Sequence, residues 1–143
     1  MDVIIVDFSK AFDLVPHGRL LVKIANSGVE ARVVEWIKQF LTGRTQRVRV
    51  GGVLSDEVGV LSGIPQGSVL GPLLFLAYVN DIGRNIESTI RLFADDCVIY
   101  RQILTNEDMT KLQRDVDRLG KWAVKNSMKI NPSKRRCALR GIG

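Results

Sequence analysis

The stretch TIRLFADDCVIY, residues 89–100, decides the fold. It is rich in β-branched and aromatic side chains on both sides of an acidic pair, Asp95 and Asp96. Asp is a poor strand former and a good turn former, so the pattern predicts strand, tight turn and strand, with the acidic pair as the turn. A second β-branched run, residues 3–6, ends at Asp7 and predicts a buried strand.

Three carboxylates thus stand where a charge is costly, at the ends of apolar strands: Asp7, Asp95 and Asp96. Burying a carboxylate costs several kcal/mol unless it is paired or bound to a metal. Mg²⁺ prefers oxygen ligands, and two such ions about 4 Å apart can hold both oxygens of an in-line phosphoryl displacement. Turn formation, helix capping or a salt bridge would also explain these acids, so their spacing alone leaves both interpretations open.

The rest of the chain predicts helices, one hairpin and a short strand. Apolar residues recur every three or four positions over residues 20–25, 31–41, 69–82 and 106–125, the last with Asn106 as its cap. The helix over residues 69–82 is apolar on most faces, so we expect it to be buried. Residues 45–50 and 58–61 flank a Gly51-Gly52 turn and predict a β-hairpin, and residues 128–130 predict a short strand.

Length and composition predict a single globular domain. The chain has 143 residues, of which 45% are hydrophobic and 25% charged, and this balance argues against disorder. The longest apolar run is shorter than the roughly 20 residues that a membrane-spanning helix needs, so we expect no membrane partner. Cys97 and Cys137 lie far apart without a C-x-x-C pattern, which favours a reducing, intracellular location (nucleus or cytoplasm) over secretion.

The net charge of +6 is unevenly distributed. Residues 1–100 hold ten Lys and Arg against eleven Asp and Glu, whereas residues 101–143 hold eleven against four. A basic final third indicates a polyanionic partner such as nucleic acid. A solvated basic helix is the competing interpretation.

Four stretches resemble, in order, motifs A to D of reverse transcriptases. They are VDFSKAFD (residues 6–13), SGIPQGSVLGPLLF (62–75), FADD (93–96) and residues 122–134, which end in NPSK. The motif B stretch, residues 62–75, is the most specific of the four. The four motif sequences are most similar to those of jockey-like non-LTR retrotransposons. The resemblance implies an α+β polymerase palm over residues 1–134, a ferredoxin-like or RRM-like antiparallel sheet with helices packed on one face. Residues 135–143 have no clear pattern and are expected to form an irregular, truncated tail.

The resemblance also implies a catalytic centre with two Mg²⁺ ions, for which Mn²⁺ can substitute. Asp7 and Asp95 would bind both metals, and Asp96 would have a weaker or indirect role. The backbone carbonyl of Phe8 would be a further ligand.

Nucleotide-binding residues follow from the same resemblance. The backbone N–H groups near Lys10 and Ala11 would face the triphosphate. Phe12 stands where the family has the steric gate that excludes a 2′-hydroxyl, although a plain core aromatic is the alternative. Gln66 would contact the incoming nucleotide, with Pro65 and Gly67 shaping the loop, and Lys134, or its neighbour Arg135, would stabilise the pyrophosphate leaving group.

Other residues receive simpler interpretations. Arg44, Arg47 and Arg49, on and just before the predicted hairpin, suit template or primer phosphates, or form a solvated strand face. His17 is interpreted as structural. Trp36 and Trp122 are interpreted as core aromatics.

The implied family function is RNA-templated DNA synthesis from an RNA template, a DNA primer and dNTPs. The family's fingers would precede motif A and its thumb would follow motif D, so we expect both to be missing and isolated synthesis to be weak or absent. Two alternatives stay open: a non-catalytic nucleic-acid-binding remnant of a mobile element, and a translated but poorly stable relic.

Overall fold

The computed structural model describes residues 1–132 and 136–138. Whereas composition predicts one domain, the chain divides into two compact units, each treated by itself below. The first unit joins Met1–Ala11 to Asn80–Gly143, and the second is Phe12–Val79. No helix in the described part of the chain is both long and apolar enough to cross a membrane.

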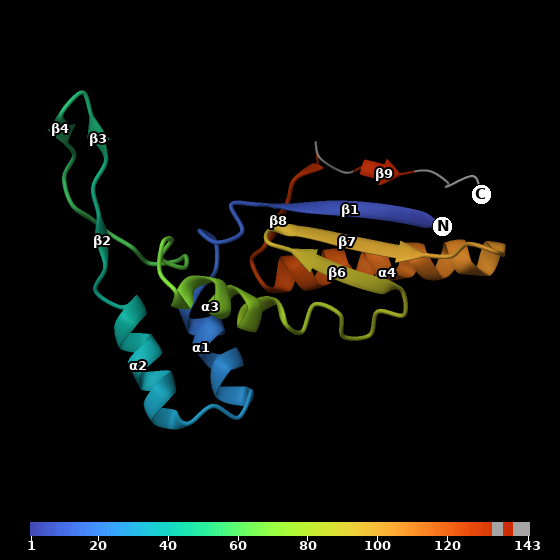
Figure 1. Cartoon of the computed structure of the whole chain (residues 1–143), viewed down its shortest axis with the longest axis horizontal. Helices are drawn as coiled ribbons and strands as arrows, with labels where there is room; N and C mark the ends of the chain where they lie inside the picture. The colour runs from blue at the N-terminus through green and yellow to red at the C-terminus, as the bar shows by residue number, and fades with distance from the viewer. Residues whose placement is uncertain (133–135, 139–143) are drawn as a thin grey trace. The chain divides into compact units, whose positions relative to one another are not determined.

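The first unit is built on an antiparallel sheet whose central strand is β1 (Asp2–Ser9) (Figure 1). One edge of β1 pairs with β7 (Asp96–Arg101), which in turn pairs with β6 (Thr89–Phe93). The other edge of β1 pairs at its end with β8 (Lys129–Ile130) and at its start with β9 (Arg136–Ala138). The predicted strands are therefore confirmed, and they form the antiparallel sheet of the predicted fold class.

A strand at residues 136–138 was not expected, because the sequence predicts an irregular tail there. Its backbone pairs with Val3, Ile4 and Ile5 of β1. An open strand edge presents unpaired N–H and C=O groups that can recruit a segment with little pattern of its own. The tail's short sequence carried no period that could have predicted this pairing.

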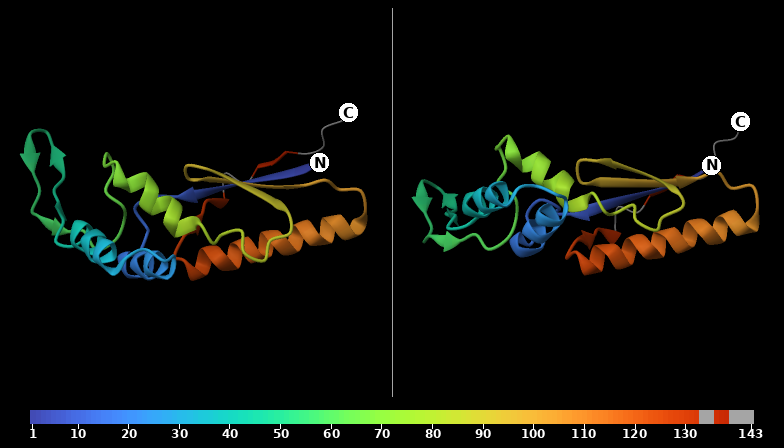
Figure 2. Two further views of the ribbon diagram at one scale, coloured as in Figure 1. Left: turned by 60° about the horizontal axis from the view of Figure 1, so that its bottom comes forward. Right: turned by 90° about the horizontal axis from the view of Figure 1, so that it is seen from below.

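Helix α4 (Asn106–Lys125) covers one face of the sheet, where it packs against β7 and β8 (Figure 2). Its buried side includes Leu112, Leu119 and Ala123, and the facing core includes Cys97 and Ile99, both 0% exposed. Burial raises the pKa of Cys97 to about 12, so this thiol is unreactive near neutral pH. The N-terminal cap is Thr105, one residue before the predicted Asn106, because Thr105 and Asp108 form a reciprocal capping box.

The turn between β6 and β7 lies one residue earlier than predicted. Phe93 pairs with Asp96, so the two turn residues are Ala94 and Asp95, and Asp96 begins β7. Ala94 has a φ of 53°, in the left-handed region that a two-residue hairpin turn requires and that alanine adopts only with strain. The pairing of Asp96 with β1 overrides the weak strand propensity of aspartate.

The second unit has three helices, α1 (His17–Asn26), α2 (Ala31–Leu41) and α3 (Leu70–Val79). Helix α1 packs against both of the others, and its buried residues are Leu20 and Ile24. Helix α3 is shorter than the predicted 69–82, and the expectation that it is buried holds for one side only. Its Leu74 and Phe75 are each 3% exposed, but Leu73 and Leu76 on the other side are more than half exposed.

The predicted hairpin is present but interrupted. Strand β2 (Thr45–Gln46) pairs with β5 (Val58–Gly59), and β3 (Arg49–Val50) pairs with β4 (Val53–Leu54) around the Gly51-Gly52 turn. Both glycines have positive φ, as a type I′ turn requires. Every residue of these four strands is exposed.

Candidate active site

Asp7 lies in the last third of β1 and is 7% exposed. Its position is held by Asn131, whose side-chain amide donates to Asp7 Oδ2 at 3.2 Å and whose backbone N–H donates to the Asp7 carbonyl at 2.9 Å. The NPSK stretch therefore supports the first predicted catalytic acid through its first residue. Sequence reasoning assigned no role to Asn131, because the pairing of β8 with β1 is what brings it there.

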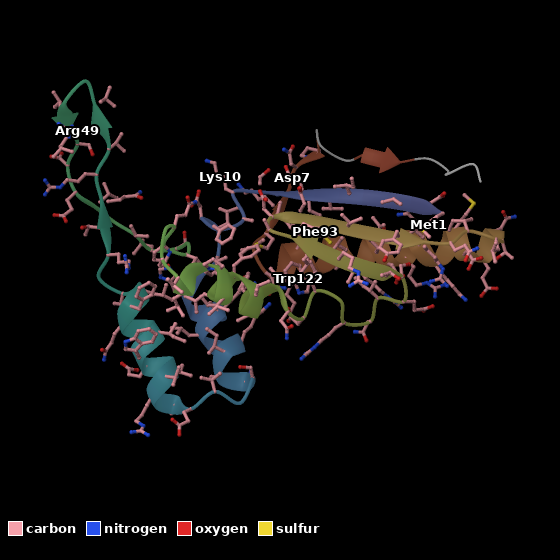
Figure 3. All side chains as sticks on the ribbon, viewed as in Figure 1. Met1, Asp7, Lys10, Arg49, Phe93 and Trp122 are labelled. Atoms are coloured by element: carbon pink, nitrogen blue, oxygen red, sulfur yellow. The ribbon has the colours of Figure 1, made fainter. Side chains whose placement is uncertain are left out.

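Asp96 is the direct cross-strand partner of Asp7, and the Phe8 N–H donates to the Asp95 carbonyl at 3.2 Å. Directly opposed residues of an antiparallel pair project from the same face of the sheet, where like charges repel. Asp95 and Asp96 are both exposed. The structure therefore brings the three predicted acids to one end of the sheet, near Asp7 and Phe93 in Figure 3, in an arrangement that a cation would stabilise.

No group of three or more His, Cys, Asp or Glu side chains within the described residues is placed to hold a metal ion. Among the described residues, this end of the sheet therefore does not form a metal site made of protein side chains alone. Mg²⁺ is usually bound by one or two carboxylates together with substrate phosphates, and the donor set here is of that kind.

Two residues near these acids have a left-handed backbone. Lys10, just after the end of β1, has a φ of 51°, and Ala94, just before Asp95, has a φ of 53°. Such conformations cost of order 1–3 kcal/mol each in residues other than glycine and are concentrated at functional sites. The two residues predicted to face the triphosphate, Lys10 and Ala11, lie in the turn that follows the acid-bearing strand. Lys10 is exposed, whereas Ala11 is 3% exposed.

Phe8 and Trp122 support the strand from beneath. Phe8 is 1% exposed and its ring centroid lies 6.2 Å from that of Trp122. The Trp122 indole N–H donates to Asp81 at 3.0 Å, so this residue is only partly the core aromatic that was predicted.

The second unit contains a pocket of about 530 Å³ formed by Phe12 and the loop before α3. Three predicted nucleotide-binding residues line it, Phe12, Gln66 and Gly67. Phe12 stacks on the buried Phe75, with ring centroids 4.3 Å apart and planes 21° apart. Phe12 therefore packs against a core residue and also lines an open pocket, and its role as a steric gate stays a prediction.

The pocket loop depends on close backbone packing at two glycines. A Cβ at Gly63 would lie 2.9 Å from the Asp13 carbonyl oxygen, and one at Gly71 would lie 2.8 Å from the Pro65 carbonyl oxygen. His17 Nε2 lies 2.6 Å from the Gly63 carbonyl oxygen, which fits the structural role predicted for this histidine. Close backbone packing therefore explains why this loop has glycine at positions 63 and 71.

The remaining predicted residues are dispersed. The Arg47 guanidinium pairs with Glu57 at 3.3 Å, Arg44 packs over the Phe40 ring, and Arg49 lies near the hairpin tip (Figure 3). Lys134 and Arg135 lie outside the described residues. Trp36 is 56% exposed, so its prediction as a core aromatic is wrong.

A family model described as "Reverse transcriptase (RNA-dependent DNA polymerase)" matches residues 3–140. The chain belongs to this family. It is 37% identical over 134 residues to the "Probable RNA-directed DNA polymerase from transposon X-element" of Drosophila melanogaster, with 90% of the chain and 15% of that protein covered. It is 34% identical over 137 residues to the "RNA-directed DNA polymerase from mobile element jockey" of Drosophila funebris, with the same coverage.

Membership of the reverse transcriptase family agrees with the fold. The structure of apo telomerase from Candida tropicalis, truncated from the C-terminal domain, aligns with 99% of this chain and 31% of its own at a TM-score of 0.69. The sequence identity is 14%, so this likeness concerns the fold alone. The chain thus spans about 15% of the length of its curated reverse transcriptase relatives.

Proposed function

We propose that this chain carries the palm catalytic centre of an RNA-directed DNA polymerase from a non-LTR mobile element. The observation that carries the proposal is the pairing of Asp7 with Asp96 beside Asp95, at one end of a sheet that belongs to this family. The reaction is attack by the 3′-hydroxyl of a DNA primer on the α-phosphate of a dNTP, directed by an RNA template, with pyrophosphate leaving.

Divalent cations fit the donors available at this end of the sheet. Asp7 and Asp95 would be the principal ligands, with Asp96 and the Phe8 carbonyl as lesser ones. When bound, two Mg²⁺ ions, or Mn²⁺ in their place, supply charge stabilisation to the attacking and leaving oxygens. The hydrogen bond from Asn131 holds the Asp7 carboxylate in a defined orientation.

Nucleotide-binding roles are proposed separately for residues of each unit. Lys10 has the left-handed backbone that anion-binding nests contain, which supports a triphosphate role for the backbone N–H groups of Lys10 and Ala11. Phe12, held flat by Phe75, is the proposed sugar gate, and Gln66 and Gly67 complete its pocket. Lys134 is proposed to stabilise the pyrophosphate, and Arg44, Arg47 and Arg49 to contact nucleic-acid phosphates.

The metal site is tested by measuring the melting temperature of the chain with and without Mg²⁺ or Mn²⁺. Binding to the folded state alone raises the melting temperature. We expect this increase in the wild type, a loss of it in Asp95→Asn and Asp7→Asn, and no loss in Asp56→Asn, an exposed acid of the hairpin region. An equal metal-induced increase in all four proteins would exclude the acids as ligands.

Catalysis is tested by primer extension on an RNA template with Mg²⁺. We expect weak extension or none from this chain, and loss of any extension in Asp95→Asn. Robust primer extension that Asp95→Asn abolishes would establish the catalytic centre. It would also refute the expectation that this chain extends a primer weakly or not at all.

A non-catalytic nucleic-acid-binding remnant is the second candidate, favoured by the basic final third of the chain. This candidate predicts salt-sensitive binding of nucleic acid that needs no divalent metal. The binding would survive both Asp7→Asn and Asp95→Asn.

A further inference from the structure

Four residues at every fourth position form one line along α2 and just beyond it: Arg32, Trp36, Phe40 and Arg44. We call them the stacking stripe. Each carries a flat group, a guanidinium at the two ends and an aromatic ring at the two middle positions. Residues four apart lie on the same face of a helix, so the stripe is continuous along α2.

Three members of the stripe, Trp36, Phe40 and Arg44, are ordered by contacts with one another. The Trp36 and Phe40 ring centroids are 6.2 Å apart and their planes differ by 23°. The Arg44 guanidinium carbon lies 4.4 Å from the Phe40 ring centroid, and Arg44 Nε donates to the Phe40 carbonyl at 2.7 Å. These contacts limit rotamer freedom in advance, which reduces the entropy cost of binding a partner.

The stripe is not what holds the second unit together. The core side of α2 is formed by Ile37 and Leu41, which are 5% and 1% exposed. Trp36 is 56% exposed and lines a hollow of about 290 Å³ together with Glu30, Arg32 and Val33. A large aromatic face is thus presented to solvent beside a space that a flat group could occupy.

The charge around the stripe identifies the kind of partner. Residues 30–49 contain five Lys and Arg and two acidic residues, so their net charge is positive. The two acids, Glu30 and Glu35, lie 3.8 Å from Arg32 and Lys38, respectively. Aromatic faces bordered by guanidinium groups bind single-stranded nucleic acid, because bases stack on the rings and phosphates pair with the cations.

We propose that the stacking stripe binds an unpaired nucleic-acid strand, with a base stacked on Trp36. An unpaired strand is favoured over a duplex because the base faces of a duplex are covered by their neighbours, whereas an unpaired base can present its face to Trp36. The inference rests on the proposed function, because a template-directed polymerase must hold an unpaired template. It adds a binding surface within the second unit, formed by residues that have no part in the proposed metal site.

The test uses Trp36 as its own reporter. The chain has two tryptophans, so Trp122→Phe leaves Trp36 as the only source of indole emission. This protein is titrated with a 20-nucleotide oligo(U) in EDTA, and with an RNA hairpin duplex of equal length. We expect oligo(U) to quench Trp36 emission strongly at saturation and the duplex to change it little.

Affinities are measured separately by fluorescence anisotropy of labelled oligo(U), with Trp122 intact. We expect Trp36→Ala to weaken binding about 5- to 150-fold, the range for loss of one base–aromatic stack, and Trp36→Phe to retain most of the affinity. Val22→Ala, a matched change of a side chain 60% exposed on α1, is expected to bind as the wild type does. An unchanged urea midpoint in Trp36→Ala verifies that the variant is folded.

Unchanged oligo(U) affinity in Trp36→Ala, or unchanged Trp36 emission at saturating oligo(U), would overturn the proposal. Equal weakening of oligo(U) and duplex binding would also overturn it. Because the titrations contain no divalent metal, the result is independent of the metal-induced change in melting temperature. Failure of either proposal can therefore be recognised without the other.

Discussion

The two sets of antiparallel strands in this chain have similar side chains and opposite environments. In the sheet of the first unit, Val6 and Ile99 are 2% and 0% exposed. In the hairpin of the second unit, Val50, Val53 and Leu54 are 72%, 72% and 56% exposed. β-Branched composition therefore sets the strand conformation in both places but does not set the burial.

The difference comes from the covering layer. Helix α4 packs against β7 and β8 of the sheet, whereas every residue of the hairpin strands is exposed in the described chain. Because neighbouring strand residues project from opposite faces, Asp7 lies on the face away from α4, whereas Phe8 packs against Trp122 of α4. Asp7 is held there at 7% exposure by its hydrogen bonds with Asn131. The uncovered hairpin is held by polar contacts. Hydrogen bonds from Thr45 and, to a lesser degree, Arg47 lower the pKa of Glu57. The exposed strands of this hairpin suit contact with a partner.

The largest expected effect comes from removing the aromatic ring beneath the active-site strand. Phe8→Ala leaves a cavity next to Trp122 and is expected to reduce the free energy of unfolding by about 3–5 kcal/mol. Urea unfolding followed by circular dichroism measures this loss. The matched control is Phe93→Ala on the same sheet, where the ring is 65% exposed and a change within about 0.5 kcal/mol is expected. Equal losses in the two variants would mean that the sheet is not covered as described.

A buried carboxylate of the first unit gives the next largest effect. Asp115 is 1% exposed and accepts hydrogen bonds from the Ser88 hydroxyl at 2.7 Å and the Ser88 N–H at 2.8 Å. Asp115→Ala leaves these two donors without their acceptor and is expected to cost about 2–3 kcal/mol at pH 7. Asp117→Ala, an exposed neighbour on the same helix, is expected to cost less than about 0.5 kcal/mol.

The loss should depend on pH in a defined direction. Burial acts to raise the pKa of Asp115, but the hydrogen bonds from Ser88 and the charge of Arg118 outweigh it and hold the pKa below its ordinary value. A lowered pKa gives stability that is present above about pH 3.9 and is lost as the pH falls through the folded-state pKa. The difference between wild type and Asp115→Ala should therefore narrow below about pH 4. A difference that is constant down to pH 2 would contradict this linkage.

Sequence reasoning succeeded where a pattern depends on neighbours along the chain. Local periodicity and turn chemistry predicted the β1 strand, the helices at residues 31–41 and 106–125 and the Gly51-Gly52 turn, although β1 runs on to Ser9, two residues past the predicted end at Asp7. The positions of Asp7, Asp95 and Asp96 suggested a shared metal site but left turn formation, capping or a salt bridge as alternatives. The resemblance of motifs decided between them, because no local pattern specifies which strands pair.

The errors lie where a distant partner decides the outcome. The register of β7 on β1 moved the turn to Ala94 and Asp95, and the edge of β1 recruited β9 from a tail without a pattern. Exposure was misjudged at Trp36 and on one side of α3 because apolar residues predict burial only where another layer covers them. Asn131 was missed because its role depends on contacting a residue 124 positions away.

The smallest expected effect makes the sharpest test of the comparison, because it applies one substitution to both sets of strands. Val53→Thr on the hairpin changes a side chain that is 72% exposed, and Thr suits a strand as well as Val does, so the free energy of unfolding should change by less than about 0.5 kcal/mol. Val6→Thr places the same hydroxyl at a position 2% exposed in the sheet and is expected to cost about 1–3 kcal/mol. Both are measured by urea unfolding under the same conditions. If Val53→Thr proves as costly as Val6→Thr, the hairpin is covered in solution, by a second copy of the chain or by part of the same one, and its exposure no longer supports a role in contacting a separate partner.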